Sequence, residues 1–228
     1  EMPFCFNKKF EKSVLVCDET AGFLQIHHRF DVPASNSGRI SMNQAASDTI
    51  SVIENQLYFV ISKSIPSQSP QQISFTTDHD MHYYPFCDDF GPFNLVVVFR
   101  FCRKLRRLLV TRGPTPLLYY TTGDKRQAAN CAFLLAAFLI MELGHTAEQA
   151  WRPLAQLDAS SLAAFRDASY EPADFTLSVL DCVGGLAKAR DSGLVNFKDG
   201  SFDADEYELF DDPANGDMHV LVPGRFIA

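Results

Sequence analysis

Hydrophobic positions along the chain form two patterns. Short apolar runs rich in β-prone residues predict strands, and these runs cover residues 49–53, 57–62 and 117–121. Longer segments repeat apolar residues at intervals of three and four, which predicts helices over residues 92–109, 126–143 and 174–191. Strands that alternate with helices predict an α/β domain with a mixed, mostly parallel sheet flanked by helices.

The first 47 residues have a different pattern. Two β-prone runs, residues 13–17 and 23–27, are separated by a turn and predict a β-hairpin-like extension over residues 1–32. Residues 33–47 are small and polar, which predicts a flexible linker. The main domain is therefore expected to begin near Asp48.

Charge and composition exclude several classes of protein. The net charge of −8 argues against a nucleic acid partner, which needs a dense basic surface. The longest apolar run, residues 131–141, is shorter than the roughly twenty residues of a membrane span. The six cysteines include no CxxC pair, which predicts reduced thiols and an intracellular protein of the cytoplasm or nucleus.

Basic residues gather in one predicted helix and the loop after it. They are Arg100, Arg103, Lys104, Arg106, Arg107 and Arg112. Most of them fall opposite the apolar stripe of that helix, which is typical of a solvated face. A site for an anion or an acidic partner is the alternative.

Potential metal ligands occur in two places, but neither has the spacing of a known metal site. His79, His82 and Cys87 lie among several aspartates, and their spacing matches no zinc motif. Asp203 and Asp205 resemble the start of a calcium loop, but the later positions lack the required glycine and glutamate. We therefore expect no metal and no cofactor.

No catalytic motif is present either. A cysteine phosphatase needs a cysteine and, six positions later, an arginine that grips the phosphate. None of the six cysteines has one, and the nearest case pairs Cys182 with Lys188 inside a predicted helix. The sequence also lacks a nucleotide-binding P-loop, a serine nucleophile elbow and a zinc protease helix.

Several short motifs, taken in order, resemble one family. They are residues 57–60 (LYFV), 89–95 (DFGPFNL), 100–105 (RFCRKL), 130–134 (NCAFL), 165–168 (FRDA), 205–208 (DEYE), 215–217 (NGD) and 222–228 (VPGRFIA). Together they resemble the amino-terminal domain of the cell-division-cycle-fourteen dual-specificity protein phosphatases.

The resemblance implies an architecture and a function. Members of this family have two phosphatase-like domains joined by an acidic helical linker, and only the second domain holds the catalytic loop. The first domain shapes a groove for phosphoserine-proline sites that are followed by a basic residue. Residues 48–198 would then form the non-catalytic domain, and residues 199–228 the acidic linker helix and the start of a missing catalytic domain.

The resemblance also suggests a role for the predicted strand, loop and helix at residues 117–143. They are laid out like a phosphatase loop, with Tyr120 near the cysteine position, Asp124 in the loop and Arg126 six residues after Tyr120. A phenol with a pKa of about 10 is a poor nucleophile beside a thiol. The segment would be a degenerate catalytic loop, whereas the residues without the resemblance favour an ordinary turn between a strand and a helix.

The carboxyl-terminal region is strongly acidic. Residues 199–217 contain eight aspartates and glutamates and no lysine or arginine, which fits a solvated face. Asp203 and Glu206 can cap a helix that Pro213 ends. By the resemblance, Glu206, Glu208 and Asp211 would bind basic substrate residues, and Arg166 and Asp167 of the FRDA motif would also contact the substrate.

Three functions remain open at this point. The first is substrate recognition beside an adjacent catalytic domain, with phosphorylated proteins that carry basic residues as partners. The second is a stand-alone pseudophosphatase with a structural or scaffolding role, for a cytoskeletal or other protein partner. The third is an enzyme whose site the sequence does not reveal.

Overall fold

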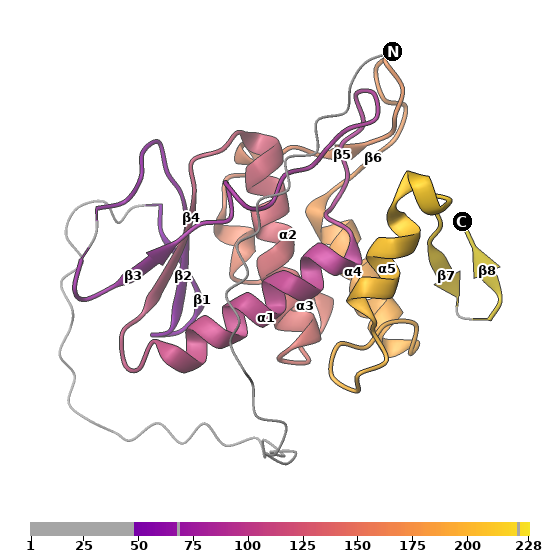
Figure 1. Cartoon of the computed structure of the whole chain (residues 1–228). Helices are drawn as coiled ribbons and strands as arrows, with labels where there is room; N and C mark the ends of the chain where they lie inside the picture. Colours follow the sequence, from indigo (N-terminus) through magenta and orange to yellow (C-terminus); the bar gives the residue numbers. More distant parts are fainter. Residues whose placement is uncertain (1–47, 68, 223) are drawn as a thin grey trace. The chain divides into compact units, whose positions relative to one another are not determined.

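A four-stranded mixed sheet forms one side of the domain (Figure 1). The computed structural model describes residues 48–67, 69–222 and 224–228; the predicted hairpin extension and linker lie outside these ranges. The strands follow the order β1 (Ile50–Ile53), β2 (Leu57–Ile61), β4 (Leu117–Thr121) and β3 (Ile73–Phe75). β1 pairs with β2 antiparallel, whereas β4 pairs parallel with β2 and β3. The predicted α/β class and mostly parallel sheet are confirmed.

The central strand β4 is buried along its whole length. Its sequence, LLYYT, has no alternation of apolar and polar residues, as expected for a parallel strand covered on both faces. Tyr119 is fully buried and its ring stacks on Phe75, with the ring centres 4.9 Å apart. This packing holds β4 in place up to its last residue, where the loop to α2 begins.

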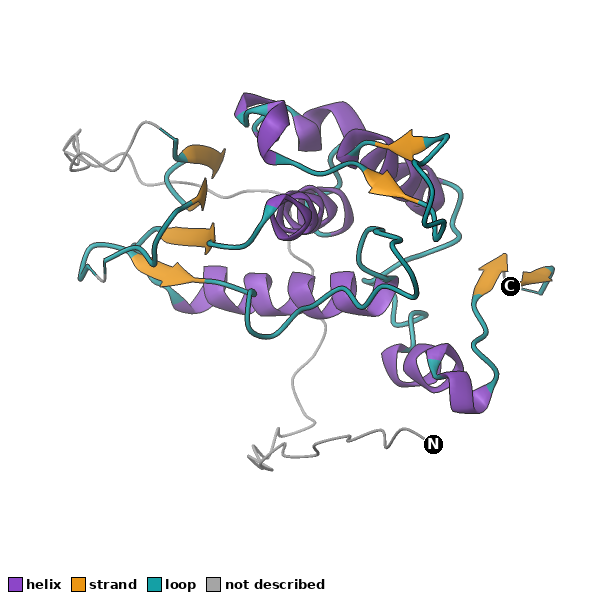
Figure 2. Cartoon of the chain, turned by 90° about the horizontal axis from the view of Figure 1, so that it is seen from above, coloured by secondary structure: helices purple, strands orange, loops and turns teal. Residues whose placement is uncertain are grey.

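In the described part of the chain, five α-helices pack beside the sheet or at the edge of the domain. They are α1 (Leu95–Thr111), α2 (Lys125–Met141), α3 (Ala147–Trp151), α4 (Val179–Asp191) and α5 (Ala204–Asp211). Every residue of α2 from Ala128 to Met141 is buried, so its apolar run is a core helix as predicted. Figure 2 looks nearly along the axis of α2, which lies between α1 and the pair formed by α3 and α4.

Two helix starts differ from the predicted positions because the caps were not foreseen. α1 begins at Leu95, three residues later than predicted, since the Asn94 side chain accepts a hydrogen bond from the N–H of Val97. The predicted start of α4 at residue 174 is wrong. Ser178 and Asp181 form a capping box there, and residues 176–177 belong to a strand instead.

Two small antiparallel pairs complete the fold. β5 (Phe165–Arg166) pairs with β6 (Thr176–Leu177), and β7 (Val220–Val222) pairs with β8 (Phe226–Ile227). These strands are too short to produce a hydrophobic pattern that predicts them. Among the described residues, no helix is both long enough and apolar enough to cross a membrane.

Candidate functional site

The degenerate loop connects β4 to α2. Tyr120 lies inside β4 and is only 8% exposed, packed in a cluster with Val60 and Leu118. The phenol is thus part of the sheet packing. The position that would hold a nucleophilic cysteine in a phosphatase loop is occupied by a core side chain.

The carboxylates of Asp78 and Asp124 accept hydrogen bonds from the loop and from the first turn of α2. Asp78 accepts hydrogen bonds from the Thr121 hydroxyl (2.8 Å) and from the backbone N–H of Thr122 (2.8 Å). Asp124 accepts from the backbone N–H groups of Arg126 (2.9 Å) and Gln127 (3.0 Å). In a phosphate site, such loop and helix donors point at the anion. Here the chain's own carboxylates occupy them.

Gly123 makes this closed turn possible. A β-carbon at this position would lie 2.5 Å from the β-carbon of Gln127 and 2.6 Å from its γ-carbon. No real side chain tolerates such contacts, so the loop requires glycine. The tight turn also directs the N–H of Gly123 to the Thr121 hydroxyl at 3.1 Å.

Arg126, at the position of the phosphate-gripping arginine, has internal partners. Its guanidinium lies 3.0 Å from Asp88 and 5.4 Å from the ring centre of Phe90. Asp88 also pairs with Arg166 at 2.7 Å. One carboxylate therefore joins two of the predicted site residues, from α2 and from β5.

Arg166 holds the loop that follows β5. Its guanidinium donates to the carbonyl oxygens of Ser169 and Glu171, both at 2.7 Å, and lies 4.0 Å from Asp167. Its side chain is 19% exposed. The structure assigns Arg166 these internal contacts, and its predicted role toward substrate, with that of Asp167, stays a prediction.

A small hollow opens beside the loop. It has a volume of about 180 Å³. Its lining is His82, Tyr83, Pro85, Phe90, Asp124, Arg126, Gln127 and Asn130. Ligand pockets usually measure about 300–1,000 Å³. The hollow is therefore too small to bury a phosphorylated side chain together with its flanking residues.

Tyr83, which lines the hollow, forms a short hydrogen bond with Asp89. The Tyr83 hydroxyl donates to a carboxylate oxygen of Asp89 at 2.5 Å. Burial, and then this bond, raise the pKa of Tyr83 to about 12. The same bond is the main cause that lowers the pKa of Asp89.

This pair predicts a pH dependence at the alkaline end. An unfolded tyrosine ionises near pH 10, whereas Tyr83 keeps its proton in the folded chain up to about pH 12. The contribution of Tyr83 to stability is complete below about pH 10 and is lost as the pH rises from there. We expect urea denaturation to show a smaller loss of stability between about pH 9 and pH 11 for Tyr83→Phe than for the wild type. Equal losses would show that Tyr83 is not the titrating group.

The acidic helix α5 docks on α1 through charged and polar contacts. Glu208 forms an ion pair with Arg100 at 2.6 Å. Asp211 accepts a hydrogen bond from the Asn94 side chain at 3.3 Å and pairs with the ring of His219. Two of the predicted substrate contacts thus have partners within the chain.

The start of α5 is more open. Asp203 caps the helix by accepting from the N–H groups of Asp205 and Glu206, each at 3.0 Å. Glu206 is exposed, and its carboxylate has no hydrogen bond or ion pair with the part of the chain that the structure describes. Glu206 is therefore the most available of the three predicted acidic contacts.

The predicted site residues fall into two groups. Tyr120, Asp124, Arg126, Arg166 and its neighbour Asp167 belong to the loop region, and the three α5 acids form a separate group. The sequence pattern does not reveal the contacts that define both groups, which come from Asp78, Asp88, Arg100 and His219. Within the described ranges, no group of three His, Cys, Asp or Glu side chains gathers to hold a metal ion.

Comparison with known proteins identifies the family. The family model for the N-terminal half of dual specificity protein phosphatases matches residues 51–189. Dual specificity protein phosphatase CDC14AB of Danio rerio is 37% identical over 178 residues, which cover 77% of this chain and 29% of that protein. CDC14C of Homo sapiens is also 37% identical over 178 residues, covering 77% of this chain and 39% of that protein.

A fungal relative shows a more distant likeness. Tyrosine-protein phosphatase CDC14 of Saccharomyces cerevisiae is 31% identical over 183 residues, which cover 79% of this chain and 32% of that protein. The chain thus spans about a third of the length of the relatives it matches. The matched part contains the sheet, the occupied loop and α2. The chain therefore belongs to the family formed by the N-terminal half of dual specificity protein phosphatases.

Proposed function

We propose that this chain is a non-catalytic substrate-recognition domain of a dual-specificity protein phosphatase. It acts beside a catalytic domain and favours phosphoserine-proline sites that are followed by a basic residue. The observation that carries the proposal is the occupied loop, where Asp78 and Asp124 take the donors that a phosphate would need. Such a domain has the phosphatase fold but no open site for an anion. The surfaces around the occupied loop are then available to recognise a substrate.

The acidic helix supports the recognition role. α5 and its flanks carry carboxylates without a single lysine or arginine between residues 199 and 217. Glu206 is exposed, and the Glu208 side chain remains 41% exposed although it is paired with Arg100. Carboxylates that are close together concentrate a negative potential, which attracts a lysine or arginine side chain.

The carboxyl-terminal hairpin supports a neighbouring domain. β7 and β8 expose apolar side chains that the domain leaves uncovered: Val220, Leu221, Phe226 and Ile227 are each more than half exposed. Contiguous exposed apolar side chains typically mark an interaction site. A catalytic domain that packs on this hairpin would cover them.

The test measures substrate preference when the chain is joined to a catalytic half. We expect a phosphopeptide with Lys after the phosphoserine-proline to be preferred over one with Ala, by up to about tenfold, because each exposed ion pair contributes about 0.2–1 kcal/mol. Glu206→Gln with Glu208→Gln should abolish most of the preference, while Asp211 keeps its contacts with Asn94 and His219. Activity on a small aryl phosphate should stay unchanged.

Arg100 offers a variant with the opposite expected sign. It competes with the substrate for Glu208, so Arg100→Gln should free the carboxylate and increase the preference for Lys. Glu54→Gln with Glu148→Gln is the charge-matched control, since both side chains are exposed and lie outside α5, in the turn after β1 and in α3. An unchanged preference in the Glu206/Glu208 variant, or an equal loss in the control, would assign selectivity to another surface.

A further inference from the structure

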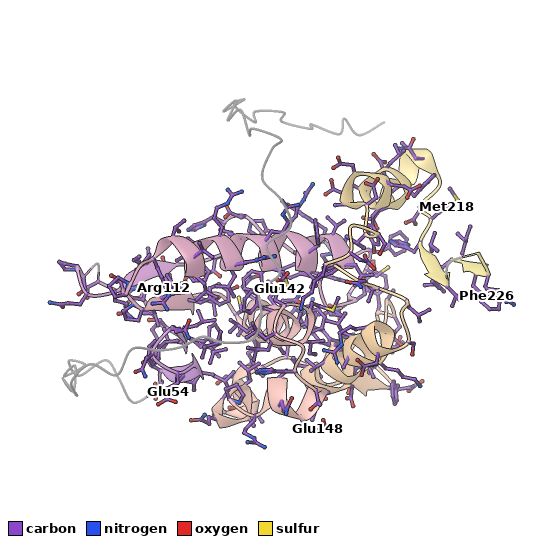
Figure 3. All side chains as sticks on the ribbon, turned by 90° about the horizontal axis from the view of Figure 1, so that it is seen from below. Glu54, Arg112, Glu142, Glu148, Met218 and Phe226 are labelled. Atoms are coloured by element: carbon purple, nitrogen blue, oxygen red, sulfur yellow. The ribbon has the colours of Figure 1, made fainter. Side chains whose placement is uncertain are left out.

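The outer face of α1 carries five cations and no acidic residue. We call this face the basic ridge; its members are Arg100, Arg103, Lys104, Arg106 and Arg107. Their spacings of three and four place most of them on one exposed stripe. The stripe is about 10 Å long from Arg100 to Arg107, since each helical residue rises about 1.5 Å. In Figure 3, nitrogen-tipped side chains point away from α1 on the side opposite the other core helices.

Three members of the basic ridge already bind carboxylates. Besides Arg100 with Glu208, Lys104 pairs with Asp80 at 2.8 Å, and Arg106 lies 3.8 Å from Glu142. All three acids come from outside α1. The ridge therefore binds protein carboxylates within this chain.

The remaining two members, Arg103 and Arg107, pair with no carboxylate in the described part of the chain. The Arg107 side chain has no hydrogen bond, ion pair or ring contact with any residue in the described part of the chain, and only its backbone carbonyl accepts a hydrogen bond from the Thr111 hydroxyl. Within the same ranges, the one interaction of the Arg103 side chain is with the ring of Phe99, 5.5 Å from the ring centre. Phe99 in turn packs against Phe197 and Phe202, with ring centres 5.2 Å away in both cases. Because these contacts hold the Phe99 ring in place, the ring positions the Arg103 guanidinium in the absence of a partner.

We propose that Arg103 and Arg107, flanked by Arg100 and Lys104, bind an acidic segment of a partner protein. Guanidinium groups recognise carboxylates through paired hydrogen bonds, and this ridge already binds three of them. The site borders the acidic helix α5, because Arg100 pairs with Glu208, but Arg103 and Arg107 form no ion pair with α5 in the described part of the chain.

Charge around the ridge disfavours a nucleic acid or an anionic membrane. The Asp80 side chain, beside Lys104, is 60% exposed, and that of Glu208, beside Arg100, is 41% exposed. The whole chain carries a net charge of −8. A large polyanion would meet these charges, whereas a short acidic peptide can fit between them.

The chain's own first 47 residues are not the acidic partner. They contain as many basic as acidic side chains: Glu1, Glu11, Asp18, Glu19 and Asp31 against Lys8, Lys9, Lys12, Arg29 and Arg39. A segment without net charge is not attracted electrostatically to the basic ridge.

The test measures binding of a blocked peptide of alternating Glu and Ala to the full chain. Its Gln–Ala counterpart serves as the neutral probe. We expect the Glu–Ala peptide to bind and the Arg103→Glu, Arg107→Glu variant to lose at least about tenfold in affinity. Binding should also weaken strongly as the salt rises from about 0.1 M to about 1 M, where the Debye length falls from about 10 Å to about 3 Å.

A charge-matched control separates the ridge from net charge. Arg152→Glu with Lys63→Glu makes the same charge change at exposed positions outside α1 and should alter the affinity less than about twofold. Arg103→Gln with Arg107→Gln should still lose most of the binding, which guards against a folding defect in the reversal variant.

Three results would overturn the proposal. The first is an equal loss of binding in the control variant. The second is equal binding of the Gln–Ala peptide. The third is a DNA duplex or an anionic vesicle that binds the chain more tightly than the Glu–Ala peptide and loses its binding on the same two substitutions.

Discussion

Neither this chain nor its Tyr120→Cys variant is expected to hydrolyse phosphotyrosine, phosphoserine or a small aryl phosphate. Enzymes typically accelerate such reactions by at least about 10⁶-fold, through a nucleophile and a set of donors aimed at the developing charge. In this chain, position 120 is in the sheet core, and the loop donors are bound to Asp78 and Asp124. A cysteine alone restores neither an accessible nucleophile nor an anion site.

The measurement is turnover of an aryl phosphate by repurified chain, next to a catalytic half as the positive control. Asp78→Ala combined with Tyr120→Cys is the informative extension, because it frees the Thr122 N–H as well. We expect this double variant to be inactive too, since Arg126 stays paired with Asp88. Hydrolysis by the wild-type chain that disappears on one substitution in this chain would contradict the account.

Replacing Asn130 by Ala is expected to destabilise the domain by about 2–4 kcal/mol. Asn130 lies in α2 and is 1% exposed. Its carbonyl oxygen accepts from the N–H of Phe93 (3.0 Å), and its amide donates to the carbonyl of Gly91 (3.2 Å). Alanine would leave two backbone groups without partners, and each costs about 1–3 kcal/mol when buried.

Urea denaturation provides the measurement, with Asn196→Ala as the matched control. Asn196 is exposed, and its side chain accepts from the N–H of Lys198 at 2.8 Å. We expect the control to change stability by less than about 1 kcal/mol. A similarly small change for Asn130→Ala would show that water replaces the lost partners and that α2 does not depend on this contact.

The long elements of this fold follow from the sequence, because their hydrophobic patterns are strong. β4 and α2 lie close to their predicted positions, and each is an apolar run that the core surrounds. The start of α4 could not be predicted in the same way. A strand of two residues, β6, and the capping box of Ser178 occupy the region where the apolar spacing suggested a longer helix.

The contacts of the candidate site are harder to predict from the sequence than the long elements are. Tyr120, Asp124 and Arg126 are within a few residues of one another, so a sequence motif can contain them. Asp78 reaches the same loop from 44 residues away, and Arg100 reaches Glu208 from 108 residues away. No spacing rule connects such positions, and these contacts decide whether the loop and the acidic helix are open or occupied.

A nuclear magnetic resonance titration of the chain with a phosphoserine-proline-lysine peptide tests the central claim most directly. Backbone amide signals report separately on the loop and on the acidic helix. The account predicts saturable shifts in residues 204–211, weaker shifts for the peptide with Ala in place of Lys, and unchanged signals for residues 121–127. Saturable shifts in residues 121–127 with no response in α5 would show that the loop binds phosphate, and would contradict the account.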